Sequence, residues 1–75
     1  MIKDAEIDFA IRVAIGNRQL KTARIIGEVG YKFGLEYDTI AERIYELVER
    51  GAIECFGNVE NWRHSELRLP VAELK

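Results

Sequence analysis

The side chains that could perform nucleophilic catalysis are few and lie near the carboxyl end of the chain. His64 is the only histidine, Cys55 is the only cysteine, and Ser65 directly follows the histidine. A nucleophile must approach its general base to about 3 Å, so His64 would have to meet Ser65 or Cys55. We expect Cys55 to face a small core and His64 to lie in an exposed loop. The residues therefore predict that the chain is not an enzyme.

Metal and phosphate chemistry also have little support. Structural zinc takes four ligands, whereas the chain offers one cysteine and one histidine without a paired spacing such as C-x-x-C. Gly27, Gly30 and Gly34 are not followed by the lysine and serine of a phosphate-binding loop. We interpret them as packing and turn glycines, and we predict no cofactor, no metal and no small-molecule substrate.

Length and composition indicate one small globular domain over residues 1–75. The chain is 48% hydrophobic and 32% charged, which is the balance of a folded domain with a single core. One cysteine cannot form an internal disulfide, and a small secreted domain normally needs such bonds. Asp4, Glu6 and Asp8 interrupt the apolar residues of the amino terminus, as no signal-peptide core would allow. We expect a cytoplasmic protein that does not bind membranes.

Charge is distributed unevenly along the chain, although the formal net charge is only −2. Residues 1–35 hold six Lys and Arg against four Asp and Glu, whereas residues 36–75 hold five against nine. The carboxyl-terminal half is therefore acidic. This half would repel the phosphates of a nucleic acid, because positive charge supplies most of the free energy of that binding.

Two helices are predicted in the first half of the chain. Apolar residues with helical spacing follow Asp4, a candidate cap, and stop at Gly16. A second helical pattern extends over residues 20–34, with Thr22 as its candidate cap. The glycines inside this pattern indicate either close packing of the helix or early fraying.

A third helix is predicted from a capping box and a regular apolar stripe. Thr39 and Glu42 have the S/T-x-x-E spacing of the box, and Gly51 follows the last apolar residue of the stripe. Across the whole chain the apolar patterns predict a set of ten buried residues. These are Ile7, Ile11, Ile26, Val29, Ile40, Ile44, Leu47, Ile53, Leu67 and Leu69.

After Gly51 the apolar period changes from helical to alternating. Residues 53–56 and 66–69 alternate as strands do, and a polar loop over residues 57–64 separates them. Three helices followed by a hairpin are the order of a winged helix-turn-helix. We therefore predict an α+β fold, a three-helix winged helix-turn-helix with a two-stranded β-hairpin wing.

Two resemblances accompany this pattern. Arg43, Ile44, Leu47, Gly51 and Ile53 resemble the junction between recognition helix and wing in many winged-helix regulators, where a glycine ends the helix and an isoleucine begins the strand. That resemblance covers about residues 20–70.

A narrower resemblance concerns the end of the chain. Asp38, Arg43, Leu47, Gly51, Gly57 and the run RHSELRLP over residues 63–70 resemble the end of an uncharacterised bacterial domain family with an RHSE(V/L)RLP-type terminal strand. In that family the acidic and basic positions matching Asp38 and Arg43 recur, and valine is more common where Leu67 stands. The resemblance implies no activity.

Charged residues of the third helix are spaced to lie along its solvent side. Glu42, Glu46 and Glu49 share that side, and solubility alone would explain them. Arg43 and Arg50 are spaced to pair with Glu46, and each such pair would add about 0.2 to 0.5 kcal/mol to stability.

Trp62 stands among polar residues and allows two interpretations. Its indole either folds back onto the core or contacts a partner, because a tryptophan beside an arginine is typical of binding hot spots. Tyr31, Phe33 and Tyr37 present the same alternative.

Two functions remain open, and the first is that of a DNA-binding transcriptional regulator. The third helix would enter a major groove, the amide end of the second helix would meet a phosphate, and the wing would touch the neighbouring groove. Three glutamates on the reading helix oppose this function. The candidate DNA contacts are Lys21, Thr22, Arg24, Arg43, Arg50, Arg63 and His64.

The second function, which we favour, is protein interaction, with a larger partner or within a homodimer. Basic first helices and an acidic third helix would select an oppositely charged surface. The candidate contacts are Tyr31, Tyr37, Glu42, Glu46, Glu49, Trp62 and Arg63.

Overall fold

In the computed structural model, which describes residues 2–70, the chain begins with helix α1 (Asp4–Ile15). The backbone N–H of Lys3 donates to the Glu6 carboxylate at 3.0 Å. The N-cap is therefore Lys3, and the predicted cap, Asp4, is instead the first residue inside the helix. The predicted end is confirmed, since Gly16 follows the helix with a φ of 61°, a value that favours glycine.

A two-residue strand, β1 (Leu20–Lys21), precedes helix α2 (Thr22–Phe33). The second helix thus begins two residues later than predicted, and its N-cap is Lys21. Thr22 is wrong as a cap because its hydroxyl is buried and shares a hydrogen bond of 2.7 Å with the hydroxyl of Ser65. Gly34 ends α2 in the left-handed region, with a φ of 67°.

Close packing accounts for one of the two interior glycines of α2. A Cβ atom on Gly30 would lie 3.2 Å from both the ring of Tyr37 and the carbonyl oxygen of Leu35. The missing side chain therefore lets the turn after α2 fold tightly against the helix. Gly27, in contrast, has open space around the position of a Cβ atom.

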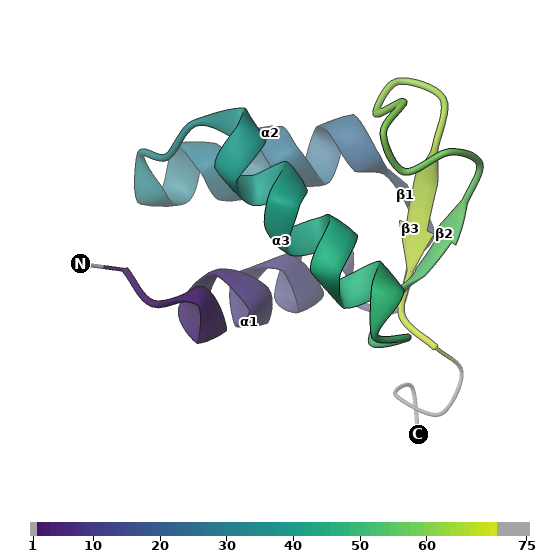
Figure 1. Ribbon diagram of the computed structural model, residues 1–75, viewed down its shortest axis with the longest axis horizontal. Coiled ribbons are helices and arrows are strands. Elements are labelled where there is room, and N and C mark those ends of the chain that lie inside the picture. The colour runs from purple at the N-terminus through teal and green to yellow at the C-terminus, as the bar shows by residue number, and fades with distance from the viewer. Residues whose placement is uncertain (1, 71–75) are drawn as a thin grey trace.

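Helix α3 (Tyr37–Glu49) crosses in front of α1 and α2 (Figure 1). The predicted capping box is wrong, because the N-cap is Glu36 and the backbone N–H of Thr39 donates to the carbonyl of Glu36 at 3.1 Å. Thr39 is therefore the third residue of the helix. Gly51 follows the helix as predicted, with a φ of 76°.

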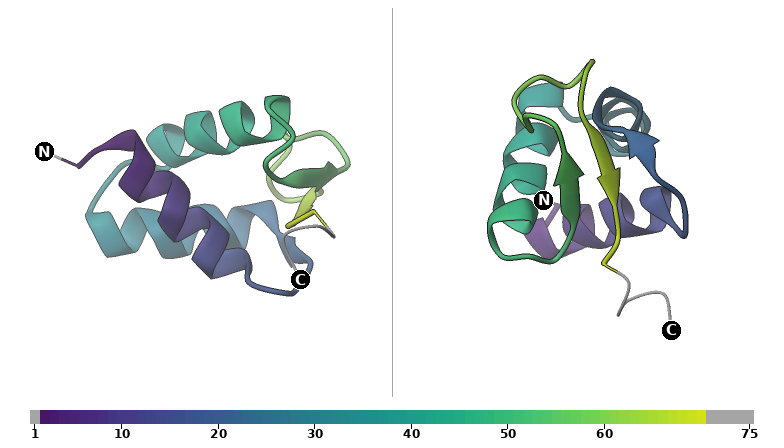
Figure 2. Two further views of the ribbon diagram at one scale, coloured as in Figure 1. Left: turned by 90° about the horizontal axis from the view of Figure 1, so that it is seen from below. Right: turned by 90° about the vertical axis from the view of Figure 1, so that its right-hand side faces the viewer.

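The predicted hairpin is confirmed as strands β2 (Glu54–Phe56) and β3 (Glu66–Arg68). Strand β1 was not predicted, and it adds a third antiparallel strand in the order β1-β3-β2 (Figure 2). Leu67 at the centre of the sheet pairs with Leu20 on one side and with Cys55 on the other. The loop between β2 and β3, residues 57–65, is called the wing below.

One hydrophobic core lies between the helices and the sheet. All ten residues predicted to be buried are buried, together with Ala10, Ala14, Ile15 and Ile25. The described chain is thus an α+β fold in which three packed helices are followed by an antiparallel hairpin, consistent with a winged helix-turn-helix. Within residues 2–70, the helices are too short or too polar to cross a membrane.

Candidate interaction face of helix α3 and the wing

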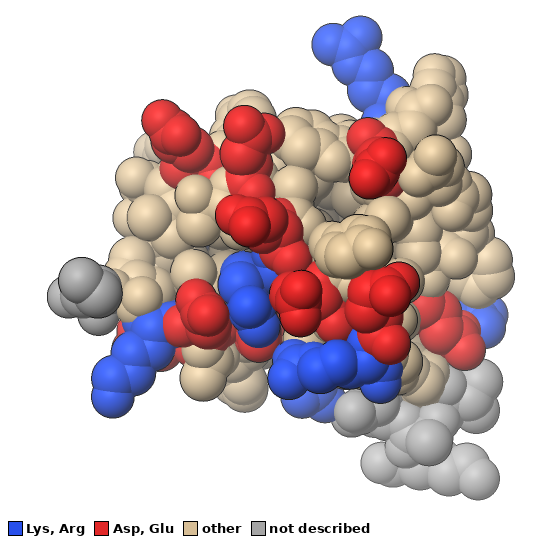
Figure 3. All heavy atoms as spheres, viewed as in Figure 1, with Lys and Arg blue, Asp and Glu red and all other residues tan. Residues whose placement is uncertain are grey.

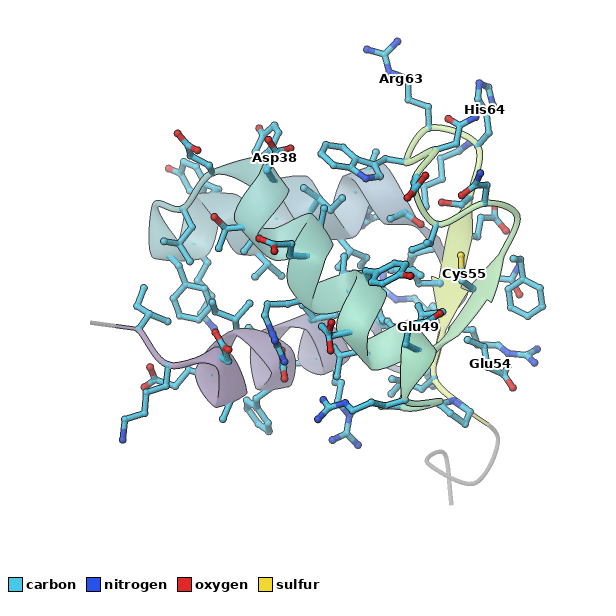
Figure 4. All side chains as sticks on the ribbon, in the orientation of Figure 1. Asp38, Glu49, Glu54, Cys55, Arg63 and His64 are labelled. Atoms are coloured by element: carbon cyan, nitrogen blue, oxygen red, sulfur yellow. The ribbon has the colours of Figure 1, made fainter. Side chains whose placement is uncertain are left out.

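The outward side of α3 is acidic, as the spacing of its glutamates predicts. Glu42, Glu46 and Glu49 are all exposed, because the apolar stripe of the same helix faces the core. Asp38 is also exposed and lies at the beginning of α3 (Figure 4). Carboxylates consequently spread over the whole length of α3 in the surface view (Figure 3).

Arg43 lies beside Glu42 and Glu46, and its guanidinium binds α1. Its guanidinium donates two hydrogen bonds to the carboxylate of Asp8, from Nε at 2.9 Å and from Nη2 at 2.8 Å. Asp4 lies 3.4 Å from the same group. The side chains of Arg43 and Asp8 are only 19% and 16% exposed. The hydrogen bond with Asp8 raises the pKa of Arg43 further above its usual range, although burial opposes this shift.

The predicted ion pairs within α3 are replaced by pairs between helices. Arg50 also turns towards α1, where its Nη2 atom lies 3.5 Å from the Asp8 carboxylate. The prediction that Glu46 pairs with Arg43 or Arg50 is therefore wrong, because Asp8 attracts both arginines. As a result Glu46 has no ion-pair partner among residues 2–70.

A groove separates α3 from the wing, and both elements contribute uncharged and acidic side chains to it. From α3 it is lined by Asp38, Ala41, Glu42 and Tyr45, and from the wing by Val59, Glu60 and Trp62. Figure 3 shows this face, with carboxylates around a hollow next to the wing. Trp62 thus joins the acidic side of α3 in one surface, which we call the α3–wing face.

Trp62 packs on the core, as one of its two predicted roles requires, and its contact with a partner stays a prediction. Its ring is partly buried and packs against the hydrophobic core, and it also lines the groove. The wing is fixed in this position by the backbone, since the N–H of Ala23 donates to the Trp62 carbonyl at 3.2 Å. Within the wing, the side-chain oxygen of Asn58 accepts the N–H of Glu60 at 2.9 Å. The tryptophan is therefore held by folded structure at the edge of the face.

At the amino end of α2, where a phosphate contact is predicted, two backbone N–H groups are bonded to the wing. Thr22 is fully buried, and its backbone N–H donates to the carbonyl of Ser65 at 3.0 Å. The next amide, that of Ala23, is bonded to the wing as well. Two of the N–H groups on which anion binding at a helix end depends are thus already bonded here.

The remaining candidate DNA contacts lie at a corner away from the α3–wing groove. Lys21, Arg24, Arg63 and His64 are exposed, and the Nζ atom of Lys21 donates to the Arg63 carbonyl at 3.5 Å. Arg63 and His64 extend outward from the tip of the wing (Figure 4). The structure thus brings a few basic groups together beside the wing, but not on α3.

The aromatic residues near the second turn do not join the groove. Tyr31 is 91% exposed on α2, and Tyr37 is exposed above Gly30. Sequence reasoning placed both with Trp62 as partner contacts, but neither lines the groove. Glu42 and Trp62, both predicted as partner contacts, do line it. Sequence reasoning did not propose Ala41, Tyr45, Val59 or Glu60 as contacts. For the two on α3, the signal was the spacing i, i+3, i+4 and i+7 of Asp38, Ala41, Glu42 and Tyr45.

Of the three residues considered for nucleophilic catalysis, Cys55 and Ser65 lie together, whereas His64 does not join them. The Ser65 hydroxyl is buried against Thr22, and the Cys55 thiol donates to the Gly57 carbonyl at 3.6 Å. His64 extends away from both in Figure 4. Within residues 2–70, there is no group of three or more Asp, Glu, His and Cys side chains that could hold a metal ion.

Comparison with known proteins adds nothing to this geometry. No family model, curated protein or solved structure matches the chain. The functional argument therefore rests on the α3–wing face itself.

The reactivity of the Cys55 thiol tests how far β2, the strand before the wing, is buried. Its partial burial raises the pKa of the thiol, and a hydrogen bond with Ser65 lowers it by a smaller amount. Because the thiolate is the reactive form, alkylation by iodoacetamide at pH 8 should be slower in the folded chain than in urea. The difference should narrow as the pH rises through the raised pKa. Equal rates at pH 8 would mean that the thiol is exposed.

Proposed function

We propose that this chain is a non-enzymatic winged-helix recognition module that binds another protein, or a second copy of itself, through the α3–wing face. The orientation of Arg43 carries this proposal. In a DNA-binding winged helix the third helix lies in the major groove, and arginine is its most frequent specific reader of guanine. Here Arg43 is held by two hydrogen bonds to Asp8 and faces α1, so it is not available to a base.

The groups left on the outward side of α3 suit a protein better than DNA. Glu42, Glu46 and Glu49 would each repel a phosphate instead of releasing its counterions. A partly exposed Trp62 next to carboxylates is, in contrast, typical of protein interfaces, where aromatic side chains anchor the complex and charges select the partner.

The alternative is a DNA-binding transcriptional regulator, and one observation favours it. Lys21 lies against the backbone of Arg63, so the basic groups of the wing and of the amino end of α2 occupy one corner. Such a corner would contact phosphates without reading bases. It would therefore supply nonspecific affinity, with the steep salt dependence that accompanies it.

The proposal also includes a cellular location and a resemblance to a domain family. A cytoplasmic location accords with the single cysteine of the chain, which is free in the structure. The resemblance of residues 63–70 to the terminal strand of an uncharacterised bacterial domain family would add kinship without adding an activity.

The two functions predict opposite effects of neutralising α3. In the variant E42Q/E46Q/E49Q we expect binding to random duplex DNA at low salt to increase, because three repulsive charges are removed. Peptides selected from a random display library against the wild-type chain should bind this variant about fivefold or more weakly. The control variant E6Q/E28Q/E36Q removes the same number of negative charges as the test variant. Its three positions lie on α1, on α2 and at the N-cap of α3.

Fluorescence titrations with DNA and with the selected peptides measure both effects. Wild-type binding to DNA that falls with salt with a slope of about −0.9Z for Z phosphates would contradict the protein-binding proposal. Equal losses of peptide binding in the two triple variants would also contradict it, since they would reflect net charge and not the α3–wing face. Sedimentation of the wild type distinguishes a separate partner from a second copy.

A further inference from the structure

The groove between α3 and the wing has aromatic walls that reach solvent. Tyr45 from α3 is 45% exposed, and Trp62 from the wing is partly buried against the core. Ala41 and Val59 also line the groove and add small apolar surfaces. Aromatic faces of this kind attract a cation positioned over the ring, most strongly in the case of tryptophan.

The charges around these walls are all negative. Asp38, Glu42 and Glu60 line the groove, and no lysine or arginine does. Among residues 2–70, these three carboxylates accept no side-chain hydrogen bond and form no ion pair. Arg63 lies nearby on the wing but extends away from the helices (Figure 4). The groove therefore offers carboxylate oxygens as hydrogen-bond acceptors, and no lysine or arginine side chain of residues 2–70 lines it.

We propose that this groove receives the side chain of an arginine from a segment of a partner protein. Guanidinium fits both features, because its plane stacks on aromatic rings while its fixed donors bind carboxylates, often in pairs. Glu46 and Glu49, farther along α3, extend the negative field beyond the groove, so a segment with additional basic residues suits the surface. This inference rests on the proposed function and names the partner chemistry of the same face.

The single tryptophan of the chain provides a direct probe, because Trp62 lines the groove. The full chain is titrated with the peptide acetyl-Gly-Arg-Arg-Gly-amide and with its counterpart containing citrulline, which has nearly the shape of arginine without the charge. We expect a saturable change in Trp62 emission with the arginine peptide. Binding of the citrulline peptide should be about five- to thirtyfold weaker, because it loses both the cation–π and the ionic contacts.

Variants locate the contact within the face. The double variant E42Q/E60Q should bind the arginine peptide about three- to tenfold more weakly than the wild type. The control E28Q/E36Q removes the same charge from exposed positions that lie outside the groove and outside the α3–wing face, and it should change the affinity less than about twofold. Tyr45→Leu, which keeps the Trp62 signal, should weaken binding about two- to fivefold. Circular dichroism confirms that each variant is folded.

Several outcomes would overturn the inference. No change in Trp62 emission with the arginine peptide, equal binding of the citrulline peptide, or equal losses in the two double variants would each do so. If library-selected peptides lacking arginine bind the α3–wing face, the inference fails while the proposed function stands. If the chain binds only duplex DNA, both fail. Self-association that the arginine peptide displaces would identify the occupant as a second copy and would overturn the assignment to a separate partner.

Discussion

Replacing Leu47 by alanine is expected to lower the free energy of unfolding by about 2 to 5 kcal/mol. Leu47 is only 2% exposed and lies where α3 meets the sheet. Its carbonyl accepts the N–H of Ala52 at 2.9 Å and that of Ile53 at 3.4 Å, so the backbone there is fixed by the turn into β2. The surrounding core cannot easily collapse into the cavity that the truncation leaves, and the loss is therefore large.

Urea denaturation followed by circular dichroism measures this effect. A chain of this length has about 4 to 11 kcal/mol of total stability, so the Leu47 variant should unfold at a clearly lower urea concentration. Glu46→Ala is the matched control, since it truncates the preceding, exposed residue of the same helix and should change stability by about 0.5 kcal/mol or less. A loss below about 1 kcal/mol in Leu47→Ala would show that the helix rotates or that the core repacks around the site.

The sequence contains enough information to predict the core and the hairpin. The apolar stripes of the helices and the alternation around Ile53 and Leu67 each specify one buried face, and all ten predicted core residues are buried. Gly16, Gly34 and Gly51 mark the helix ends because each adopts a positive φ after a helix. These features are local, so a single sequence is sufficient to show them.

The helix starts and strand β1 depend on contacts that a local pattern does not show. Thr22 has the residue type of a cap, yet its hydroxyl is used by Ser65, 43 positions away. Thr39 and Glu42 have the spacing of a capping box, but Glu36 already begins the turn. The two residues of β1 are too few to show alternation, and they are strand only because Leu20 pairs with Leu67.

In the candidate site, too, the local features could be predicted from the sequence and the long-range contacts could not. Exposure of the α3 glutamates follows from helical periodicity and was predicted correctly. That Trp62 would line the same groove as Tyr45 could not be predicted, because it depends on how the wing folds back towards α2 and α3. The pair between Arg43 and Asp8 was also missed. A neighbour at i+3 gave Arg43 an apparent partner, whereas its actual partner comes from another helix.

Asp8 is expected to stabilise the fold through its position between two arginines. Replacing it by alanine leaves Arg43, which is about four-fifths covered, with only the exposed carboxylate of Asp4 as an ionic partner. It also removes the carboxylate that Arg50 shares with Arg43. Removing one member of a fully buried pair costs about 3 to 5 kcal/mol, whereas exposed pairs contribute about 1 kcal/mol or less. For this partly buried pair we expect Asp8→Ala to cost about 2 to 3 kcal/mol.

A double-mutant cycle separates the pair from its surroundings. Asp8→Ala, Arg43→Met and the double variant are compared by urea denaturation, and methionine retains most of the apolar stem that packs between α1 and α3. We expect a coupling free energy of about 1 to 3 kcal/mol between the two sites. We also expect it to persist at 0.5 M salt, because a covered pair is screened less than an exposed one. A coupling near zero would mean that Arg43 is free to leave Asp8, and it would then be available on α3 for a base or a partner, which removes the observation on which the protein-binding proposal depends.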